Sequence, residues 1–267
     1  MKLKLRDLDI LESRDMLAGL PEGKLLINTV NAHSFNTALK DGLFAEALDP
    51  TKRPEGARAE AYNKVLIPDG ASIIWACKFL NAKSRPKMRC AGWDLFAFEM
   101  KRLNDSVSDG CPKPSSLTPK PKVMFMGSSE KVLRMVKAQA AVSYPNLDIV
   151  TYSPPYKPVF SDEDNRAIVK AINDADPDLL WIGMTAPKQE KWTYSHWEEL
   201  DIHCHVGTIG AVFDFFAGTY QRAPEWFQQH GLEWLYRLVK EPRRMWRRYV
   251  LGNPLFIWNV LKEKILG

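Results

Sequence analysis

Between residues 122 and 223 the sequence alternates between short apolar runs and longer amphipathic stretches. The runs are rich in Val, Ile, Leu and Met, and in the stretches between them apolar residues recur every three to four positions. Strands that alternate with helices of this length are typical of βαβ units, whose strands lie parallel. The pattern predicts an α/β protein with a Rossmann-like parallel sheet flanked by helices. The expected strands are 123–127, 147–152, 178–183 and 202–208, and the expected helices are 129–142, 162–173, 187–197 and 211–216.

The N-terminal region shows the same alternation less regularly. The apolar run 24–31 predicts a buried strand, and 64–68 predicts a second strand that stops at Pro68. Helical spacing of apolar residues predicts helices over 32–48 and 71–80.

A stretch rich in Pro, Ser and Gly without apolar periodicity interrupts the chain at 105–121 and predicts a linker loop. From Pro224 onward, Gly and Pro residues punctuate a pattern of short helices. The expected organisation is an N-terminal α/β region over 1–104, the linker, a Rossmann-like region over 122–223, and a helical appendage over 224–267.

Composition and cysteine usage predict a globular protein of the cytoplasm. Of 267 residues, 45% are hydrophobic and 26% are charged, and no run approaches the roughly 18 to 20 apolar residues of a membrane-spanning helix. Acidic residues near the N-terminus replace the apolar core of a signal peptide. The four cysteines are scattered and form no C-x-x-C pair, which indicates reduced thiols. No metal site is predicted at His203-Cys204-His205, because neighbours in a strand point to opposite faces.

The net charge of +5 is concentrated at the C-terminus. Residues 237–267 contain eight bases and two acids, so the other 236 residues carry about −1. Arginine suits phosphate recognition because it offers forked donors and stays charged, and the Trp-, Phe- and Ile-rich run beside these bases favours an anionic membrane surface. A nucleic-acid groove and a packed helix pair with a solvated basic face are the alternatives. The arginines expected at a lipid diphosphate or membrane are Arg237, Arg243, Arg244, Arg247 and Arg248.

Polar residues follow the ends of the two N-terminal strands, where α/β proteins bind ligands. Asp69 precedes the helix 71–80 and is either a general base or the cap of that helix. Thr29 and Asn31, at the end of the first strand, can hydrogen-bond a sugar or a nucleotide, and Asn31 can equally cap the next helix.

Glycine-containing turns follow three later strands. Gly127-Ser128-Ser129 offers backbone N–H groups to a phosphate, although it matches neither the P-loop nor the G-x-G-x-x-G pattern. Gly183 closes a strand before a helix whose first turn contains Gln189, a residue able to bind a sugar or a base. Gly210 allows close backbone approach.

Asp214 lies in an otherwise apolar stretch, and buried carboxylates are rare unless they have a partner. A ribose or uracil is one such partner, and Arg222 is the other candidate.

Together these segments resemble the WecG/TagA/CpsF family, glycosyltransferase family 26, from about residue 25 to 249. The most specific carriers are Ala-Pro-Lys-Gln-Glu at 186–190, Phe-Asp-Phe-Phe-Ala-Gly at 213–218, Arg-Ala-Pro at 222–224, Gly-Leu-Glu-Trp-Leu-Tyr-Arg at 231–237 and Glu-Pro-Arg-Arg at 241–244. Thr-Val-Asn at 29–31, Pro-Asp-Gly at 68–70 and Ala-Gly-Trp-Asp-Leu at 91–95 add to them. The chain departs from the family pattern at Val30, at the turn after Gly127 and in its longer linker.

The resemblance implies a metal-independent, inverting hexosyltransferase of bacterial surface-polysaccharide or exopolysaccharide synthesis. Such enzymes use a UDP-sugar, often of the N-acetylmannosamine type and in some relatives glucose, and an undecaprenyl-diphosphate-linked acceptor. Residues 122–223 would bind the nucleotide sugar, residues 1–104 would supply the catalytic and acceptor loop, and the appendage would hold the enzyme on the inner face of the cell membrane. No cofactor and no nucleic-acid partner are expected, and family members are often oligomers.

The resemblance also implies roles for single residues. Asp69 would be the catalytic base, and Asp214 would contact the nucleotide. The residues implied at the sugar or the diphosphate are Thr29, Asn31, Arg89 and Gln189, together with the turns at Gly127, Gly183 and Gly210. A different class of function, a non-catalytic basic protein that binds anionic membrane or nucleic acid, is the alternative.

Overall fold

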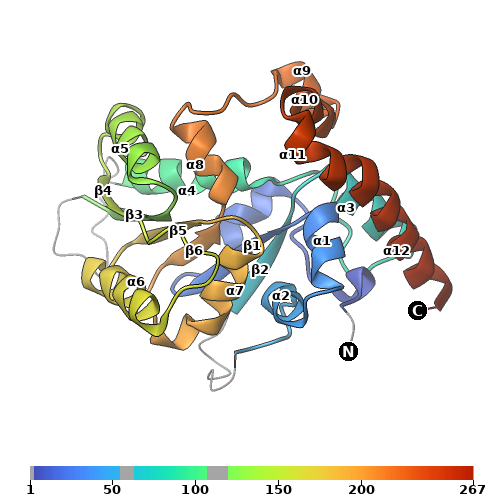
Figure 1. Cartoon of the computed structure of the whole chain (residues 1–267), viewed down its shortest axis with the longest axis horizontal. Helices are drawn as coiled ribbons and strands as arrows, with labels where there is room; N and C mark the ends of the chain where they lie inside the picture. Colours follow the sequence, from blue (N-terminus) through green and yellow to red (C-terminus); the bar gives the residue numbers. More distant parts are fainter. Residues whose placement is uncertain (1–2, 55–62, 107–119, 267) are drawn as a thin grey trace.

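A computed structural model describes residues 3–54, 63–106 and 120–266 of the chain (Figure 1). The predicted linker 105–121 and Cys111 lie mostly or wholly outside the described residues. The ribbon has a central sheet with helices on both sides, and the C-terminal helices run along one side of the molecule.

The sheet has six strands in the order β2-β1-β6-β5-β3-β4, and its strand pairs are parallel. This confirms the predicted fold class. Strands from both the 1–104 and the 122–223 regions belong to this one sheet, because β1 pairs with β6. The strands are β1 (Leu25–Val30), β2 (Asn63–Pro68), β3 (Lys122–Gly127), β4 (Asp148–Tyr152), β5 (Leu179–Gly183) and β6 (His205–Thr208).

Twelve α-helices surround the sheet in the described portion of the chain. They are α1 (Ala32–Ala38), α2 (Gly42–Leu48), α3 (Ala71–Leu80), α4 (Gly92–Ser106), α5 (Glu130–Ser143), α6 (Asp162–Ala175), α7 (Lys188–Ser195), α8 (Gly210–Phe216), α9 (Glu225–Gln229), α10 (Glu233–Lys240), α11 (Pro242–Trp246) and α12 (Gly252–Leu266). Short 3-10 helices occupy Leu5–Asp7, Arg14–Gly19 and Trp197–Glu199, and a π-helical turn, η4, covers Arg247–Leu251.

Two apolar clusters fill the two faces of the sheet. One joins the strands to α1, α2, α3, α6, α7 and α12, through residues such as Phe35, Trp192 and Phe256. The other joins them to α4, α5 and α8, through residues such as Phe96 and Phe213. Parallel sheets are normally covered on both faces in this way, which explains why the strands read as continuous apolar runs.

Some predicted ends are shifted, since β6 begins at His205 instead of residue 202 and α7 ends at Ser195 instead of residue 197. Two helices differ more. The expected helix 32–48 is two helices, because Asp41 begins a new one by accepting a hydrogen bond from the Phe44 N–H (3.1 Å). Helix α4 was not predicted, although its buried Leu95, Phe96, Met100 and Leu103 follow helical spacing.

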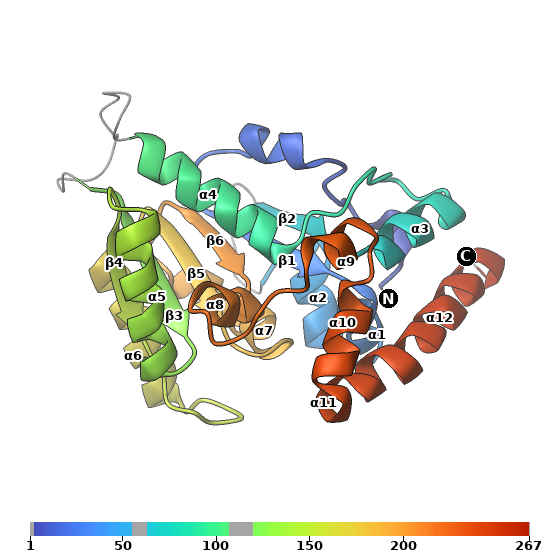
Figure 2. The ribbon, with the colours of Figure 1, turned by 90° about the horizontal axis from the view of Figure 1, so that it is seen from above.

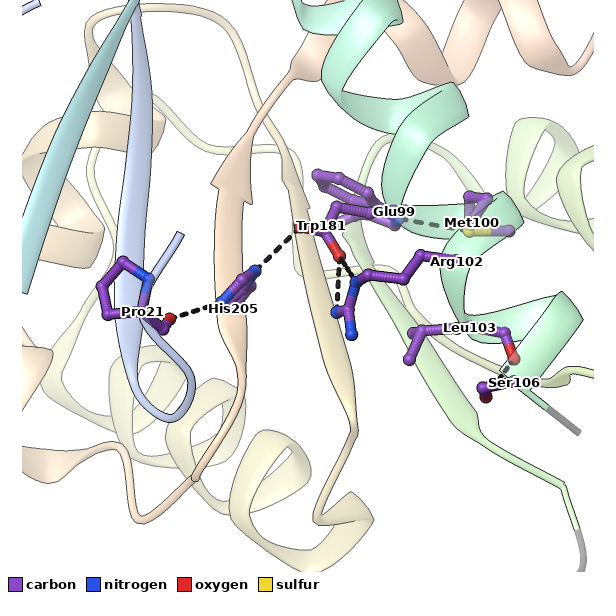
Figure 3. A network of polar contacts seen from close by, with 8 residues as sticks. All are labelled: Pro21, Glu99, Met100, Arg102, Leu103, Ser106, Trp181 and His205. Atoms are coloured by element: carbon purple, nitrogen blue, oxygen red, sulfur yellow. Dashed lines mark hydrogen bonds and ion pairs between the residues drawn. The ribbon is translucent and has the colours of Figure 1, made fainter. Parts of the chain in front are cut away.

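Helix α4 is joined to the sheet by a buried polar network (Figure 3). The side chain of Glu99 is fully buried and meets His205 Nδ1 at 2.8 Å and Arg102 Nη2 at 2.6 Å. His205 Nε2 lies 2.9 Å from the carbonyl oxygen of Pro21, so the imidazole links α4 to the segment before β1. Burial opposes ionisation, but the hydrogen bond and electrostatic influence of His205, followed by those of Arg102, hold the pKa of Glu99 below its ordinary value. His205 thus belongs to a structural network, whereas Cys204 faces the opposite apolar cluster.

The C-terminal helix α12 is anchored to the body of the protein. Phe256 and Val260 are buried, and the Phe256 ring meets Phe35 edge-on at a centroid distance of 5.9 Å. Glu263 accepts hydrogen bonds from the backbone N–H groups of Leu5 and Arg6 (3.0 and 2.8 Å). The opposite side of α12 exposes Leu255, Ile257, Trp258, Leu261 and Ile265. Within the described segments, no helix combines the length and apolar character needed to cross a bilayer.

We expect the substitution Glu99→Gln to lower the free energy of unfolding by about 3 kcal/mol near neutral pH, because it leaves a buried imidazole and a guanidinium without their carboxylate. Since the folded-state pKa of Glu99 is depressed, its contribution is complete above the unfolded pKa and is lost as pH falls through the folded value. Urea titrations of both proteins should therefore differ most near pH 7 and converge only once the pH has fallen below the depressed pKa of folded Glu99. Asp174→Asn, which breaks the exposed Lys170–Asp174 pair, should change stability by less than about 0.5 kcal/mol. A similar small loss for Glu99→Gln would contradict the assignment.

Candidate active site

Asp69 and Asn31 lie side by side at the carboxyl ends of β2 and β1. The two strands are in register up to Val30 and Pro68, and the Asp69 N–H donates to the Val30 carbonyl (2.8 Å). Asn31 Nδ2 donates to Asp69 Oδ2 at 3.2 Å, while Asn31 Oδ1 accepts from the Ser34 N–H and caps α1. Asn31 therefore caps a helix and also orients the carboxylate.

Asp69 does not cap α3. The N-cap position of that helix is Gly70, whose φ of 118° is one that glycine adopts readily, and the cap has no side-chain hydrogen bond. The sequence allowed Asp69 to be either a helix cap or a general base. The geometry excludes the cap and leaves the carboxylate available for chemistry. Its assignment as a base stays a prediction.

The electrostatic surroundings of Asp69 come largely from the C-terminal segment. Burial raises the pKa of Asp69 above its ordinary value, and the charge of Glu233 raises it further. Arg248 is the largest opposing influence, followed by the hydrogen bond from Asn31 and the charge of Arg237. Two arginines far along the chain thus act on a carboxylate at the end of β2.

His33 is a residue at this site that sequence analysis missed. It lies in the first turn of α1, two positions after Asn31, and partial desolvation together with the charge of Arg248 lowers its pKa to about 4, although the side chain keeps contact with solvent. Its imidazole is therefore neutral at pH 7. The position in the first turn after a strand was the available signal, because ligand-binding loops occupy that edge.

A pocket of about 620 Å³, here called the α3 pocket, is lined by the start of α3, and Asp69 is not among its lining residues. Arg89 lines it, and the neighbouring Cys90 N–H donates to the carbonyl of Pro68, the residue before Asp69 (2.8 Å). Its guanidinium forms an ion pair with Glu233 of α10 (2.9 Å), and Arg14 pairs with Asp94 at 3.3 Å. The lining residues are Arg14, Ala71, Ile74, Met88, Arg89, Asp94, Glu225, His230 and Gly231.

A second pocket, of about 270 Å³ and here called the α8 pocket, is lined by residues of α8, of the segment after it and of α10. Arg237, one helical turn after Glu233, lines it. The lining residues are Ala211, Asp214, Phe215, Thr219, Tyr220, Gln221, Tyr236, Arg237, Lys240 and Glu241. Because Arg237 also acts on Asp69, helix α10 links the α8 pocket electrostatically to this carboxylate.

Asp214 is half-buried in the α8 pocket rather than enclosed in the apolar core. Its Oδ1 accepts a hydrogen bond from the Thr219 hydroxyl (3.2 Å). Arg222, the alternative partner considered from the sequence, instead places its guanidinium over the Trp93 ring at 5.0 Å. The carboxylate of Asp214 therefore lies where a ligand in this pocket can reach it.

Gln189 is buried, and its amide holds two loops together. Oε1 accepts from the Met184 N–H (3.1 Å) and the Gly210 N–H (3.2 Å), and Nε2 donates to Glu190 (2.9 Å). Burial raises the pKa of Glu190 to about 7, and its Oε2 has no hydrogen-bond partner among the described residues. These hydrogen bonds satisfy the buried amide of Gln189 without a substrate, so its contact with a sugar stays a prediction.

The three strand-end glycines have packing reasons of their own. A Cβ at Gly127 would overlap the carbonyl of Gly183, a Cβ at Gly183 would overlap the Phe213 ring, and a Cβ at Gly210 would overlap the carbonyl of Met184. Close approach of backbone segments is the usual reason for such glycines. Substrate contacts at these turns are not needed to explain them and stay predictions.

The other predicted residues are placed as follows. Thr29 is partly buried in β1, two residues before Asn31. Of the five arginines, Arg237 and Arg248 act on Asp69, whereas Arg243 and Arg247 are exposed. The side chain of Arg244 lies outside the described portion of the structure.

We expect Gln189→Ala to lower the free energy of unfolding by about 2 kcal/mol, because two buried N–H groups lose their acceptor. Hydrogen exchange at the Met184 and Gly210 amides should be faster in Gln189→Ala than in the wild type. Gln139→Ala, which removes an exposed hydrogen bond to Ser143, is the matched control. It should leave the free energy of unfolding and the exchange at these two amides unchanged. Unchanged exchange in Gln189→Ala would show that the amide does not hold these loops.

Residues 8–267 match the model of the glycosyl transferase WecG/TagA/CpsF family. A relative from Bacillus subtilis (strain 168), named N-acetylglucosaminyldiphosphoundecaprenol N-acetyl-beta-D-mannosaminyltransferase, is 28% identical over 90% of this chain and 80% of its own length. A protein of the same name from Bacillus spizizenii is 27% identical over 84% and 80%. One from Staphylococcus aureus (strain MW2) is 28% identical over 54% of this chain and 53% of its own length.

Proposed function

The chain belongs to the WecG/TagA/CpsF family of glycosyltransferases, and from this premise we propose that it transfers a sugar from a UDP-sugar to an undecaprenyl-diphosphate-linked saccharide in synthesis of a cell-envelope polysaccharide. An N-acetylmannosamine-type donor is favoured over glucose, because the relatives from both Bacillus species are named as mannosaminyltransferases. Family membership makes the chain an enzyme, so the non-catalytic basic protein considered from the sequence is set aside.

The observation that carries the proposal is the Asp69 carboxylate, which Asn31 orients by a hydrogen bond and on which the charges of Arg248 and Arg237 act. In a direct displacement, the acceptor hydroxyl oxygen bonds to the anomeric carbon while the bond from that carbon to UDP breaks. Asp69 takes the hydroxyl proton, and the configuration at the anomeric carbon inverts. A raised pKa makes Asp69 a stronger base than an exposed aspartate.

We assign the donor nucleotide to the α8 pocket. Phe215 and Tyr236 offer ring surfaces for a base, and Asp214 can accept hydrogen bonds from a ribose or uracil. Arg237 and Lys240 supply positive charge to a diphosphate, and Arg237 lies between this pocket and Asp69. Charge neutralisation by these groups supports metal-independent transfer.

We assign the acceptor saccharide to the α3 pocket. Its guanidinium groups are paired with carboxylates, as in Arg14–Asp94 and Arg89–Glu233, so the lining presents both donors and acceptors without a large net charge. Such a lining suits sugar hydroxyl and amide groups. Ile74 and Met88 add apolar surface, and Ala71 brings the pocket within two residues of the base.

The C-terminal segment is proposed to hold the enzyme on the inner face of the cytoplasmic membrane. The outer side of α12 exposes Ile257, Trp258 and Leu261, and arginines precede it in α11 and η4. A basic amphipathic surface of this kind binds anionic lipid interfaces. Anionic membrane is the proposed partner rather than nucleic acid, and a homo-oligomer is compatible with the family.

We expect Asp69→Asn to reduce transfer by a factor on the order of 10²–10⁴, because the amide cannot take the proton of the acceptor hydroxyl. The measurement is UDP release from UDP-sugar in the presence of lipid-linked acceptor. Binding to anionic vesicles should be unchanged. A variant with the wild-type rate would refute the role of Asp69 as base.

We expect Arg248→Ala to move the acidic limb of the kcat/KM profile to higher pH. Arg248 holds the pKa of Asp69 down, so its removal raises that pKa and leaves less of the carboxylate deprotonated at a given acidic pH. Arg134→Ala, at an exposed arginine of α5, should leave the limb in place. An acidic limb shifted to lower pH in Arg248→Ala would contradict this arrangement.

A further inference from the structure

Two large aromatic side chains are exposed on α3, a helix to which the sequence assigned no surface role. Trp75 is 44% and Phe79 37% exposed, although both belong to types that soluble proteins tend to cover. They lie one turn apart, and their rings are stacked at a centroid distance of 5.3 Å and an interplanar angle of 11°. The pair forms a flat apolar surface on the outside of the helix.

This surface is continuous with α12, although the two helices are far apart in the sequence. Lys264 of α12 places its Nζ 5.7 Å from the centre of the Phe79 ring. Exposed Ile257 and Leu261 precede Lys264 on the same stripe of α12, since they lie seven and three residues before it. Figure 2 shows α3 and α12 on the same side of the molecule. We call Trp75, Phe79, Ile257, Leu261, Lys264 and Ile265 the α3–α12 surface.

The position of α12 beside α3 is set by buried contacts. Glu263 accepts from the Leu5 and Arg6 N–H groups, and Val260 is fully buried. The 3-10 helix Leu5–Asp7 in turn packs against α3. Buried contacts therefore fix the relative position of the two helices that form the α3–α12 surface.

The charges around this surface favour an anionic partner. Lys78 on α3 and Lys262 and Lys264 on α12 are exposed beside the aromatic and aliphatic residues. Glu263 is engaged by backbone N–H groups, and Asp9, on the adjoining N-terminal segment, pairs with Lys83 at 2.8 Å. Lysines around exposed aromatic rings match a layer of lipid phosphates above an apolar interior.

We propose that Trp75 and Phe79 insert into the interfacial layer of an anionic membrane, as a second lipid contact beside α12. The inference rests on the proposed function for its biological meaning and extends the membrane surface to a helix of the catalytic body. Helix α3 begins two residues after Asp69. At a rise of about 1.5 Å per residue, Trp75 lies about 6 Å along the helix axis from Ala71, the first residue of α3.

This placement connects the membrane to the chemistry. Ile74, beside Trp75, lines the α3 pocket. An acceptor whose saccharide occupies that pocket therefore has an apolar path from Ile74 to the lipid layer. The proposal explains why aromatic residues, rather than polar ones, cover the outside of the helix next to the base.

The test measures partition of the full-length protein onto vesicles of phosphatidylglycerol and phosphatidylcholine. Trp75→Ser with Phe79→Ser should weaken binding to the anionic vesicles about tenfold, because two partly exposed rings no longer leave water. Ile257→Ser with Leu261→Ser should weaken it similarly. Val142→Ser, at an 80% exposed residue of α5, is the control and should bind as wild type does. Wild-type binding by the α3 double variant, or no binding by the wild type, overturns the proposal.

A milder variant guards against loss of folding. With brominated lipids, Trp75→Phe should show a smaller quenched fraction of tryptophan emission than wild type, and an equal fraction overturns the proposal. Sedimentation velocity without lipid tests the competing occupant. A wild-type dimer that dissociates in the Trp75/Phe79 double variant would make this surface a contact between two copies and overturn the membrane assignment.

The vesicle assay contains no nucleotide sugar, so it separates the two proposals. Transfer activity without vesicle binding would refute the α3–α12 surface as a lipid contact and leave the transfer reaction standing. Vesicle binding without transfer would refute the proposed transfer reaction and leave the α3–α12 surface standing as a lipid contact.

Discussion

The parallel pairing of β1 with β2 is the constraint on which the candidate site depends. Because the two strands end in register at Val30 and Pro68, the next residue of each, Asn31 and Asp69, reaches the same edge of the sheet. The backbone bond from Asp69 to Val30 and the side-chain bond from Asn31 then orient the carboxylate. Burial raises the pKa of Asp69. The roles proposed for the two pockets depend on where they lie relative to this carboxylate.

The C-terminal segment completes the site from a distance. Its end is anchored by Glu263 and Val260, and Arg237 and Arg248 of the preceding residues act on Asp69. Glu233 of α10 pairs with Arg89, and Arg237, one turn later on the same face of the helix, lines the α8 pocket. The same segment that makes the chain basic therefore sets the electrostatics of Asp69 and forms a wall of each pocket. Membrane contact through α12 and catalysis at Asp69 would therefore both depend on the C-terminal segment.

Several residues singled out from the sequence prove to have structural roles as well. Gln189 clamps two loops, and Gly127, Gly183 and Gly210 allow backbone and ring contacts too close for a Cβ. In a folded chain, a motif residue at a strand end can serve packing, ligand binding or both, and spacing alone does not separate these roles. His33 was missed, and Glu233 was known only as part of the 231–237 motif, because their interactions involve Arg248 and Arg89, which are distant in sequence.

By itself, the sequence determined what depends on neighbouring residues. Apolar runs and helical spacing predicted the strands and most helices, and the alternation predicted a parallel sheet. Polar residues after strands located Asn31 and Asp69, and a carboxylate in an apolar stretch located Asp214. Tertiary structure decided the strand order, the placement of α4 by the His205–Glu99 network, and the position of α10 beside the α8 pocket. Local patterns report whether a residue is buried and in which element, because propensity and periodicity act over a few residues. Which elements meet depends on long-range packing and hydrogen bonds, and these exist only once the chain has folded.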